Sequence, residues 1–402
     1  MSVSAPIATA KTLVRDRLTW HMYAALAIWT YFLQAFSPSL PFLRTAQDTS
    51  ATISGLHGLA LAVGCFITGL IGPAIIGALG RQTALWHGLT TLSVSVIVMS
   101  FASLPTITLL ASVCAGAGGL LACNVVAATL ADHHRSLAPA ALSESNALSS
   151  VLATCAPLVL AIGVATGAGW QTGLLSVVVL VLGAALIFGS RQRPEPAIAP
   201  ASSTITSRNQ KLPRAYWAAF TALVLCCSIE SCFAMWSSDL LIERTNAGKG
   251  MAALTVTAII GGLAVGRFVS ATLISRTSIE TLLYAALATM AVGFTIFWLS
   301  GVIWLSFAAL FIGGVGIGPM YPLSMARTVR TAPHSADLAV NRTALGLAPG
   351  LGGGPFVIGM LVDAVGIANA LLIVPVLIAA AMLAVYLTTQ RGDEQAGVLN
   401  PT

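Results

Sequence analysis

Charged residues are scarce in this sequence of 402 residues. Lysine, arginine, aspartate and glutamate make up 8% of the chain, whereas 57% of its residues are hydrophobic. A soluble domain carries about a quarter charged residues, so this composition excludes an ordinary soluble protein and indicates a membrane protein. The net charge of +6 comes from basic residues in short polar stretches between apolar runs. This placement is typical of membrane topology, and we expect no nucleic-acid partner.

Sequence signatures of catalysis and of resident metals are also missing. There is no His-Glu-x-x-His, no Gly-x-Ser-x-Gly and no Gly-x-x-x-x-Gly-Lys-Ser/Thr motif. Their absence argues against hydrolytic enzymes and ATP-driven pumps. The 7 cysteines lie in apolar segments without metal-ligand spacing, and we interpret them as small buried hydrophobic residues. We therefore expect no enzyme activity, no metal and no cofactor. Residues 1–18 are polar and lack the pattern of a cleaved signal peptide.

One polar stretch divides the apolar sequence into two halves of similar length. Residues 190–214 read SRQRPEPAIAPASSTITSRNQKLPR, which is basic and rich in proline and serine. Such a stretch is too polar for lipid and is typical of a solvated connector. The expected parts are a tail at 1–18, a first bundle at 19–190, a linker at 191–214, a second bundle at 215–389 and a tail at 390–402.

Apolar runs of about 20 residues, the length that crosses a membrane as a helix, follow one another through both halves. In the first half we expect helices at 19–40, 53–75, 84–103, 106–130, 140–165 and 171–190. In the second half we expect them at 215–236, 251–273, 279–299, 302–326, 337–361 and 365–389. The predicted fold is an all-α membrane protein with twelve transmembrane helices in two pseudo-symmetric six-helix bundles.

The distribution of lysine and arginine predicts the orientation of the chain. With an even number of helices, both tails and the linker lie on one side of the membrane. The opposite side then carries only Arg44, Arg244 and Lys249, whereas the other basic loop residues lie with the linker. Because cytoplasmic loops carry the excess of lysine and arginine, we expect a multi-pass protein of the plasma membrane with both termini cytoplasmic.

The two halves repeat each other at a constant offset. The sequence Gly-Ala-Gly at 116–118 recurs as Gly-Val-Gly at 314–316, which is 198 residues later. Pro157 recurs as Pro355 at the same spacing. A constant offset over several helices indicates a duplicated six-helix unit. Parallel halves of this kind are found in one class of secondary transporters.

This architecture resembles the major facilitator superfamily across essentially the whole chain, although the local motifs depart from the superfamily's pattern. The superfamily's signature after the second helix is Gly-x-Leu-Ala-Asp-Arg-x-Gly-Arg-Lys. Here residues 73–82 read PAIIGALGRQ, with Gly77 at the position of the Asp. The second copy ends in Arg276 and has Ser275 at that position. A gating role of the acid is therefore not carried over.

A second departure concerns the direction of transport. Drug–proton exporters of the superfamily carry Gly-x-x-x-Gly-Pro-x-x-Gly-Gly in the fifth helix. Here that helix keeps only Pro157, and a close copy, GLGGGPFVIG, lies at 350–359 in the eleventh. In that copy Gly350, Gly354 and Pro355 allow close helix packing, and we also expect them to let the helix flex.

Glu230 is the only acid well inside an expected span, about two-thirds of the way along 215–236. A charge inside the hydrocarbon costs about 2.5–3.5 kcal/mol on insertion scales and marks a functional candidate. A carboxyl removed from water can hold and release a proton as its surroundings change, as proton-coupled transport requires. The alternative is a permanently protonated Glu230 bonded to a helix carbonyl, Ser228 or Ser231. We favour the coupling role.

Glu144 and Arg342 occupy matching positions of the two halves. The dipole at a helix N-terminus stabilises an anion, whereas Arg342 needs a partner such as Glu144, Asp337 or an anionic substrate. In the superfamily the fifth and eighth helices meet across the halves. The resemblance therefore implies a cytoplasmic gate in which Glu144 pairs with Arg267 or Arg276. For Arg267, an arginine snorkelling at the membrane interface is an equal alternative.

Polar side chains complete the candidate substrate cavity. The resemblance implies that the first, fourth, seventh and tenth helices line the central path. The candidates are Tyr31, Gln34, Asn124, Asn146, Tyr321 and Arg342. Each of them can alternatively form an interhelical hydrogen bond. His57 is interpreted as a structural residue near a helix start, and His133 and His134 as a solvated pair.

These features predict a secondary active transporter that moves a small organic solute by alternating access, with protons coupled through Glu230. The missing exporter signature favours uptake. Efflux of amphipathic or drug-like compounds is the alternative. A transporter-like membrane sensor is a remote alternative from another functional class. The expected partners are the solute, protons and the lipid bilayer. The usual state of the superfamily implies a monomer.

Overall fold

The structure is a computed structural model that describes residues 13–189, 212–274, 276–332, 343, 347 and 349–399. Arg342, Ser275 and all but the last three residues of the predicted linker lie outside the described residues. All regular secondary structure within the described ranges is helical, which confirms the predicted fold class.

The first half consists of six long helices joined by short connections. They are α1 (Arg17–Ala46), α2 (Ala51–Leu79), α3 (Arg81–Phe101), α4 (Pro105–His134), α5 (Ala138–Ala165) and α6 (Gln171–Phe188), with the 3-10 turn η1 (Arg135–Leu137) before α5. Local chemistry sets their starts. The Asp16 carboxylate accepts the Thr19 amide at 2.9 Å and caps α1. Gly80 turns α2 into α3 with φ of +78°, a value that favours glycine.

In the described part of the second half, some of the helices are divided into shorter elements. Its elements are α7 (Arg214–Thr245), α8 (Lys249–Ala253), α9 (Thr255–Leu273), α10 (Ile279–Leu299), α11 (Ile303–Arg330), the π-helical segment η3 (Pro349–Gly353), α13 (Gly354–Val365), α14 (Ile367–Ala370) and α15 (Ile373–Leu399). In the described part of the chain, 10 helices are long and apolar enough to cross a membrane, and Gly350–Val365 is a shorter apolar helix.

Several helices extend further than the sequence predicted. The first ends at Ala46 instead of residue 40, and the seventh ends at Thr245 instead of residue 236. Their polar ends suggested loops, but these side chains have partners inside the protein. Ser238 donates to the Ala252 carbonyl at 2.9 Å, for example. Satisfied polar groups therefore allow both helices to continue.

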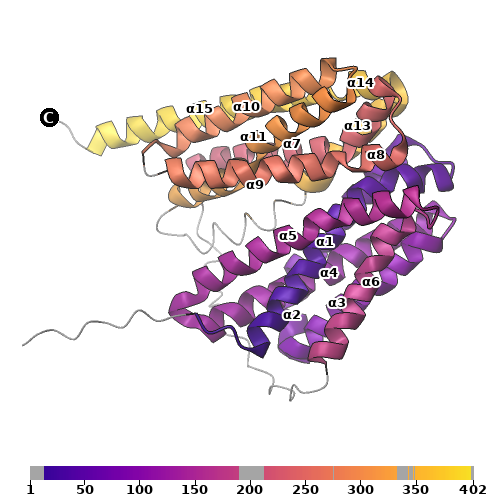
Figure 1. Cartoon of the computed structure of the whole chain (residues 1–402). Helices are drawn as coiled ribbons and strands as arrows, with labels where there is room; N and C mark the ends of the chain where they lie inside the picture. Colours follow the sequence, from indigo (N-terminus) through magenta and orange to yellow (C-terminus); the bar gives the residue numbers. More distant parts are fainter. Residues whose placement is uncertain are drawn as a thin grey trace, which may run out of the picture.

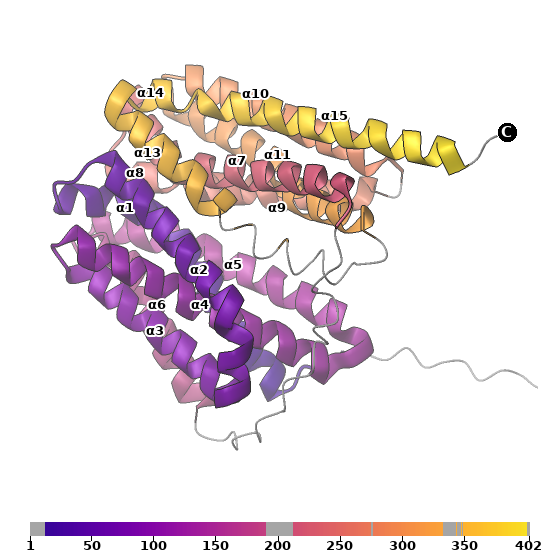
Figure 2. The same cartoon turned by 180° about the vertical axis from the view of Figure 1, so that it is seen from behind.

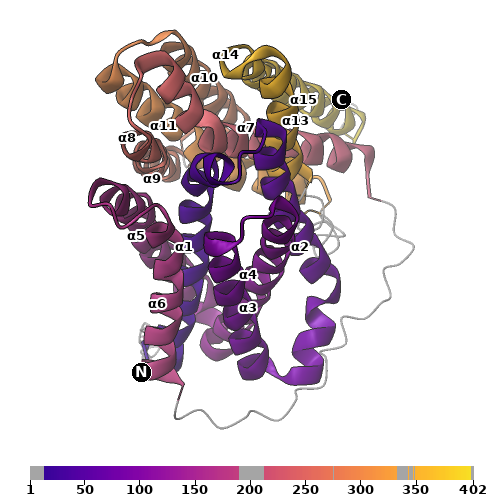
Figure 3. The ribbon, with the colours of Figure 1, turned by 90° about the vertical axis from the view of Figure 1, so that its right-hand side faces the viewer.

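The helices gather in two groups, α1–α6 and α7–α15 (Figures 1 and 2). We call the end where α6 ends and α7 begins the linker end, and the end where α1 leads into α2 the far end. The two groups lie together at the far end and diverge toward the linker end (Figures 1 and 2). Figure 3 looks onto the far end and shows α1 and α2 beside α7 and α13. The two halves are thus in contact at the far end and separated at the linker end.

The packing of α4 and α11 carries the predicted repeat. A Cβ atom at Gly116 would lie 2.1 Å from the Leu61 carbonyl oxygen of α2. A Cβ atom at Gly314 would lie 2.2 Å from the Ile259 carbonyl oxygen of α9. Both members of the second pair follow those of the first by 198 residues. The same close helix contact therefore occurs once in each half, as small residues allow in membranes.

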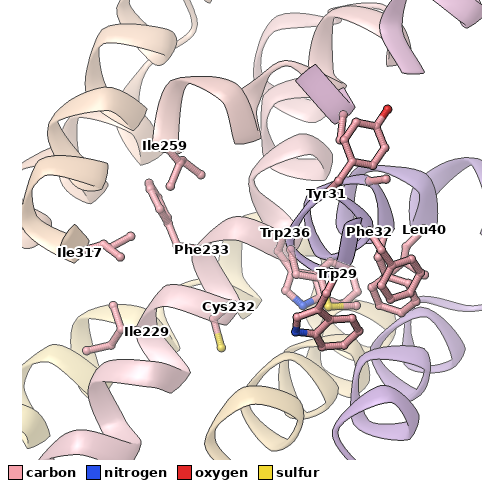
Figure 4. Packing of buried hydrophobic residues seen from close by; sticks show 14 of the residues in the cluster. Trp29, Tyr31, Phe32, Leu40, Ile229, Cys232, Phe233, Trp236, Ile259 and Ile317 are labelled. Atoms are coloured by element: carbon pink, nitrogen blue, oxygen red, sulfur yellow. The ribbon is translucent and has the colours of Figure 1, made fainter. Parts of the chain in front are cut away.

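The aromatic core lies along α1 and α7. Figure 4 shows Trp29 and Phe32 of α1, and Phe233 and Trp236 of α7, among the buried side chains. The Trp236 indole also donates to the Pro355 carbonyl at 3.1 Å, which satisfies its polar group inside the protein. This hydrogen bond joins α7 to α13.

Candidate functional site

Polar contacts join the two halves at the far end. Arg44 at the end of α1 forms an ion pair with Asp239 of α7. The Asp363 carboxylate of α13 accepts the amides of Ala51 and Thr52 at 2.9 and 2.8 Å, at the start of α2. A carboxylate is stabilised at a helix N-terminus, so this contact draws α13 toward α2. Sequence reasoning missed both acids, although opposite charges near the ends of the first and seventh helices were a usable signal.

Backbone contacts continue this junction toward the middle of the molecule. A Cβ atom at Gly55 of α2 would lie 2.9 Å from the Cα atom of Phe356. A Cβ atom at Gly352 of η3 would lie 2.8 Å from the Cα atom of Leu59. Glycine therefore allows α2 to pack directly against η3 and α13. Further along α2, large apolar side chains such as Phe66 and Leu70 are exposed.

Ion pairs at the linker end stay within one half, as far as the described residues show. Glu144 accepts two hydrogen bonds from Arg15, at 2.6 and 3.0 Å. The predicted gate partners Arg267 and Arg276 lie elsewhere in this conformation, and both are exposed. Arg81 pairs with Asp132, also inside the first half.

His133 and His134 each contact a polar residue at the start of α1, which corrects their interpretation as a solvated pair. His133 Nε2 lies 2.9 Å from an Asp16 carboxylate oxygen, and His134 Nε2 lies 2.9 Å from the Thr19 hydroxyl. Burial opposes ionisation of Asp16, but hydrogen bonds from Thr19 and the contact with His133 outweigh it, so the pKa of Asp16 is lowered. The end of α4 is thereby attached to the start of α1.

Glu230 lies near the middle of the 32-residue helix α7, because this helix is longer than predicted. Its side chain is half-buried and has no hydrogen-bond partner among the described residues. The hydroxyls of Ser228 and Ser231 donate to the Gly350 carbonyl of η3, at 3.0 and 3.3 Å. These two hydroxyls therefore donate to another helical segment and do not bind the Glu230 carboxyl group.

Arg267 of α9 and Tyr321 of α11 accompany Glu230. The Arg267 Nε atom donates to the Gly318 carbonyl of α11 at 3.3 Å. Tyr321 lies one turn after Gly318 and is 38% exposed. Arg267 is close enough to act electrostatically on both Glu230 and Tyr321. Electrostatic interactions thus link Glu230, Arg267 and Tyr321 in the second half, whereas the sequence predicted Arg267 at a cytoplasmic gate or at the membrane interface.

Tyr321 also interacts with a residue of the first half. Cys123 of α4 lies close enough to Tyr321 to interact with it electrostatically. Cys123 and Tyr321 are 198 residues apart and are therefore equivalent positions of the repeat. The interaction therefore links equivalent positions of the two halves.

The other predicted cavity residues are more dispersed. Tyr31 is buried, and its hydroxyl lies 2.8 Å from the Ser176 hydroxyl of α6, inside the first half. Gln34 and Asn124 are half-buried. Asn146 is exposed and donates to the Leu142 carbonyl of its own helix at 2.8 Å. Of the predicted cavity residues, the structure places Tyr321 beside Glu230.

His57 has two partners, so a structural role accounts for it. Its Nδ1 atom lies 2.7 Å from the Ile53 carbonyl oxygen, and its Nε2 atom lies 2.9 Å from the Thr108 hydroxyl of α4. The side chain is buried between α2 and α4.

The predicted flexing residues lie where the eleventh expected helix is irregular. The π-helical segment η3 ends at Gly353, and Pro355 follows in the first turn of α13. A Cβ atom at Gly350 would lie 2.9 Å from the Val224 carbonyl oxygen, and one at Gly354 would lie 2.8 Å from the Cys232 sulfur. Both glycines therefore serve close packing on α7. Local π-helix beside proline is a common place for a helix to bend.

The sequence and the fold match known proteins. A family model described as the Major Facilitator Superfamily matches residues 22–353. No curated protein matches the sequence. A bacterial homolog of the human lysosomal transporter Spinster, in an inward-facing and occupied conformation, has a TM-score of 0.68 at 14% identity, with 94% of each chain covered.

Two structures from E. coli are also similar. The xylose transporter XylE, in a partially occluded inward-open conformation, has a TM-score of 0.69 at 12% identity, covering 93% of this chain and 96% of the other. The fucose:proton symporter FucP has a TM-score of 0.59 at 19% identity, covering 92% and 98%. At these identities the three likenesses show a common fold.

Proposed function

The chain belongs to the Major Facilitator Superfamily, whose members are transporters and not enzymes, and we propose that it moves a small organic solute together with protons by alternating access. The observation that carries this proposal is Glu230. Its carboxyl group lies at mid-helix without a hydrogen-bond partner in the described part of the chain, close to Arg267. A carboxyl in such surroundings changes its protonation when water and a neighbouring charge approach or withdraw.

We further propose that the linker end is cytoplasmic in the plasma membrane, because the basic loop residues gather there. The divergence of the halves toward this end supports an inward-open state (Figure 1). The Spinster homolog and XylE, which are described as inward-facing and inward-open, support this assignment. The missing exporter signature favours uptake, and FucP, a fucose:proton symporter, offers a precedent within the fold.

The gate at the linker end follows from the same scheme. When the halves close there, Glu144 exchanges Arg15 for a basic residue of the second half. Arg276 is the better partner of the two predicted ones, because Arg267 already donates to the Gly318 carbonyl of α11. Arg276 is exposed at the end of α9. The transporter works as a monomer, since each chain contains both halves.

The test combines binding with proton flux. The purified protein is screened against sugars, nucleosides and other metabolites by thermal shift. Each stabilising solute is then tested in liposomes that contain a pH-sensitive dye. We expect a solute that stabilises both the wild type and Glu230→Gln but carries protons only with the wild type. Glu243→Gln is the matched control, because Glu243 is an exposed acid on the same helix. Unchanged proton flux in Glu230→Gln would refute the assignment.

A further inference from the structure

The environment of Glu230 indicates which solutes the transporter accepts. In the described part of the chain, the groups that interact electrostatically with Glu230 are Arg267 of α9, Tyr321 of α11, and Cys226 and Cys227 of its own helix. From the first half, Cys123 reaches Tyr321. Tyrosine and cysteine are neutral at physiological pH unless perturbed. Arg267 is thus the fixed charge in this group.

Arg267 has N–H donors that are not used within the described structure. Its Nε atom binds the Gly318 carbonyl, and in the described structure its two terminal nitrogens bind no protein acceptor. The Arg267 side chain is exposed, whereas Arg327 of α11 is buried and forms an ion pair with Glu280. A guanidinium held at one nitrogen, with its outer edge free, can still bind a carboxylate through two parallel hydrogen bonds.

The charges of Glu230 and Arg267 balance in only one protonation state. With Glu230 ionised, the pair is neutral. With Glu230 protonated, Arg267 retains an uncompensated charge, which is costly in the low dielectric of a membrane protein. An anion at Arg267 restores neutrality. Proton and anion therefore favour each other's binding.

We propose that the solute carries a single carboxylate, which the terminal nitrogens of Arg267 bind while Glu230 holds the proton. This inference rests on the proposed function and narrows its substrate to monocarboxylates. One cation, Arg267, and one proton site, Glu230, match a solute with one negative charge. A phosphate ester carries nearly two negative charges at neutral pH and would need a second cation. The loaded and the empty site are both neutral, as crossing the membrane requires.

The test compares acids with amides of the same shape. Thermal shift and binding titrations use acetate, lactate, benzoate and nicotinate, each beside its primary amide. We expect at least one acid to bind at least tenfold more tightly than its amide. Its affinity should rise as pH falls, by roughly tenfold per pH unit for one proton taken up. In Glu230→Gln, which mimics the protonated acid, the acid should bind independently of pH.

Arg267 variants complete the test. Arg267→Gln should lose at least tenfold in affinity for the acid, whereas Arg267→Lys, which keeps the charge, should lose less. Arg330→Gln is the control, because it removes an equal charge from an exposed arginine at the end of α11. Size-exclusion profiles and thermal stability show that the variants are folded. The inference is overturned if none of the four acids binds better than its amide, or if Arg267→Gln binds as the wild type does.

The two proposals fail in different ways. A neutral solute that moves protons through Glu230 would overturn the carboxylate inference and leave the proposed function standing. A carboxylate that binds at Arg267 but moves without protons, equally in the wild type and Glu230→Gln, would refute the proton coupling. In that case the carboxylate assignment of Arg267 would remain.

Discussion

Arg44 of the first half forms an ion pair with Asp239 of the second half, and this contact closes the far end of the transporter. The side chains are 24% and 10% exposed, so the pair lies between a surface pair and a buried one. Breaking it should cost about 1–3 kcal/mol, between the values for these two classes. The pair exists only while the halves touch at the far end. It therefore stabilises the conformation seen here over one that is open at the far end.

We expect Asp239→Asn to raise the population that is open at the far end. The readout is amide hydrogen exchange of Ala51 and Thr52, whose amides bind Asp363 across the junction. Their exchange should accelerate several-fold, since about 1.4 kcal/mol changes a population ratio tenfold. Asp48→Asn is the control, because Asp48 is an exposed acid at the same end. Equal exchange in Asp239→Asn and the wild type would show that the pair does not hold the halves together.

Asp363 should act on the same equilibrium by a different interaction. Asp363→Ala removes the acceptor for the first amides of α2, and loss of such a cap costs about 1 kcal/mol. Asp16→Ala is a matched control, since Asp16 caps α1 from within the same half. Both variants should lower thermal stability, but only Asp363→Ala should accelerate exchange at the far end. Acceleration by Asp16→Ala as well would mean that the effect is general destabilisation.

The sequence predicted the helical fold and the repeat, and it singled out Glu230 as a candidate, because each leaves a local or periodic signal. Apolar runs reveal the helices, and the 198-residue offset reveals the repeat. The electrostatic interaction of Glu230 with Arg267 left no such signal, since it depends on how α7, α9 and α11 pack. The same limit explains Asp239 and Asp363. Each looks like an acid near a helix end, and its partner lies in the other half of the chain.

The repeat makes a quantitative prediction about two glycines. Gly116→Ala and Gly314→Ala would each place a methyl group about 2.1–2.2 Å from a backbone oxygen of the neighbouring helix. We expect each to lower stability by about 1–3 kcal/mol or more, the cost of overpacking, and the two losses to be similar. Thermal denaturation in detergent measures them. Gly77→Ala should be harmless, because nothing lies within 4 Å of its Cβ position. A loss in one half alone would show that the two contacts are not equivalent.

A substitution at Gly353 can test whether η3 and α13 flex without disturbing how they pack. Substitutions at Gly350 and Gly354 would collide with α7 and so would confuse the two roles. Gly353 has nothing within 4 Å of its Cβ position and has helical angles, with φ of −67° and ψ of −44°. Gly353→Ala should therefore fit, and alanine favours a helix by about 1 kcal/mol over glycine.

If alternating access bends the chain here, Gly353→Ala should slow transport several-fold while thermal stability stays equal or rises. Solute uptake into liposomes and thermal denaturation give the two readouts. Gly183→Ala in α6 is the matched control. It makes the same change in another helix, and nothing lies within 4 Å of its Cβ position. It should leave the rate unchanged, because α6 has no π-helical segment and no proline. An unaltered rate in Gly353→Ala would mean that this part of the chain moves as a rigid body, and its glycines would then serve packing alone.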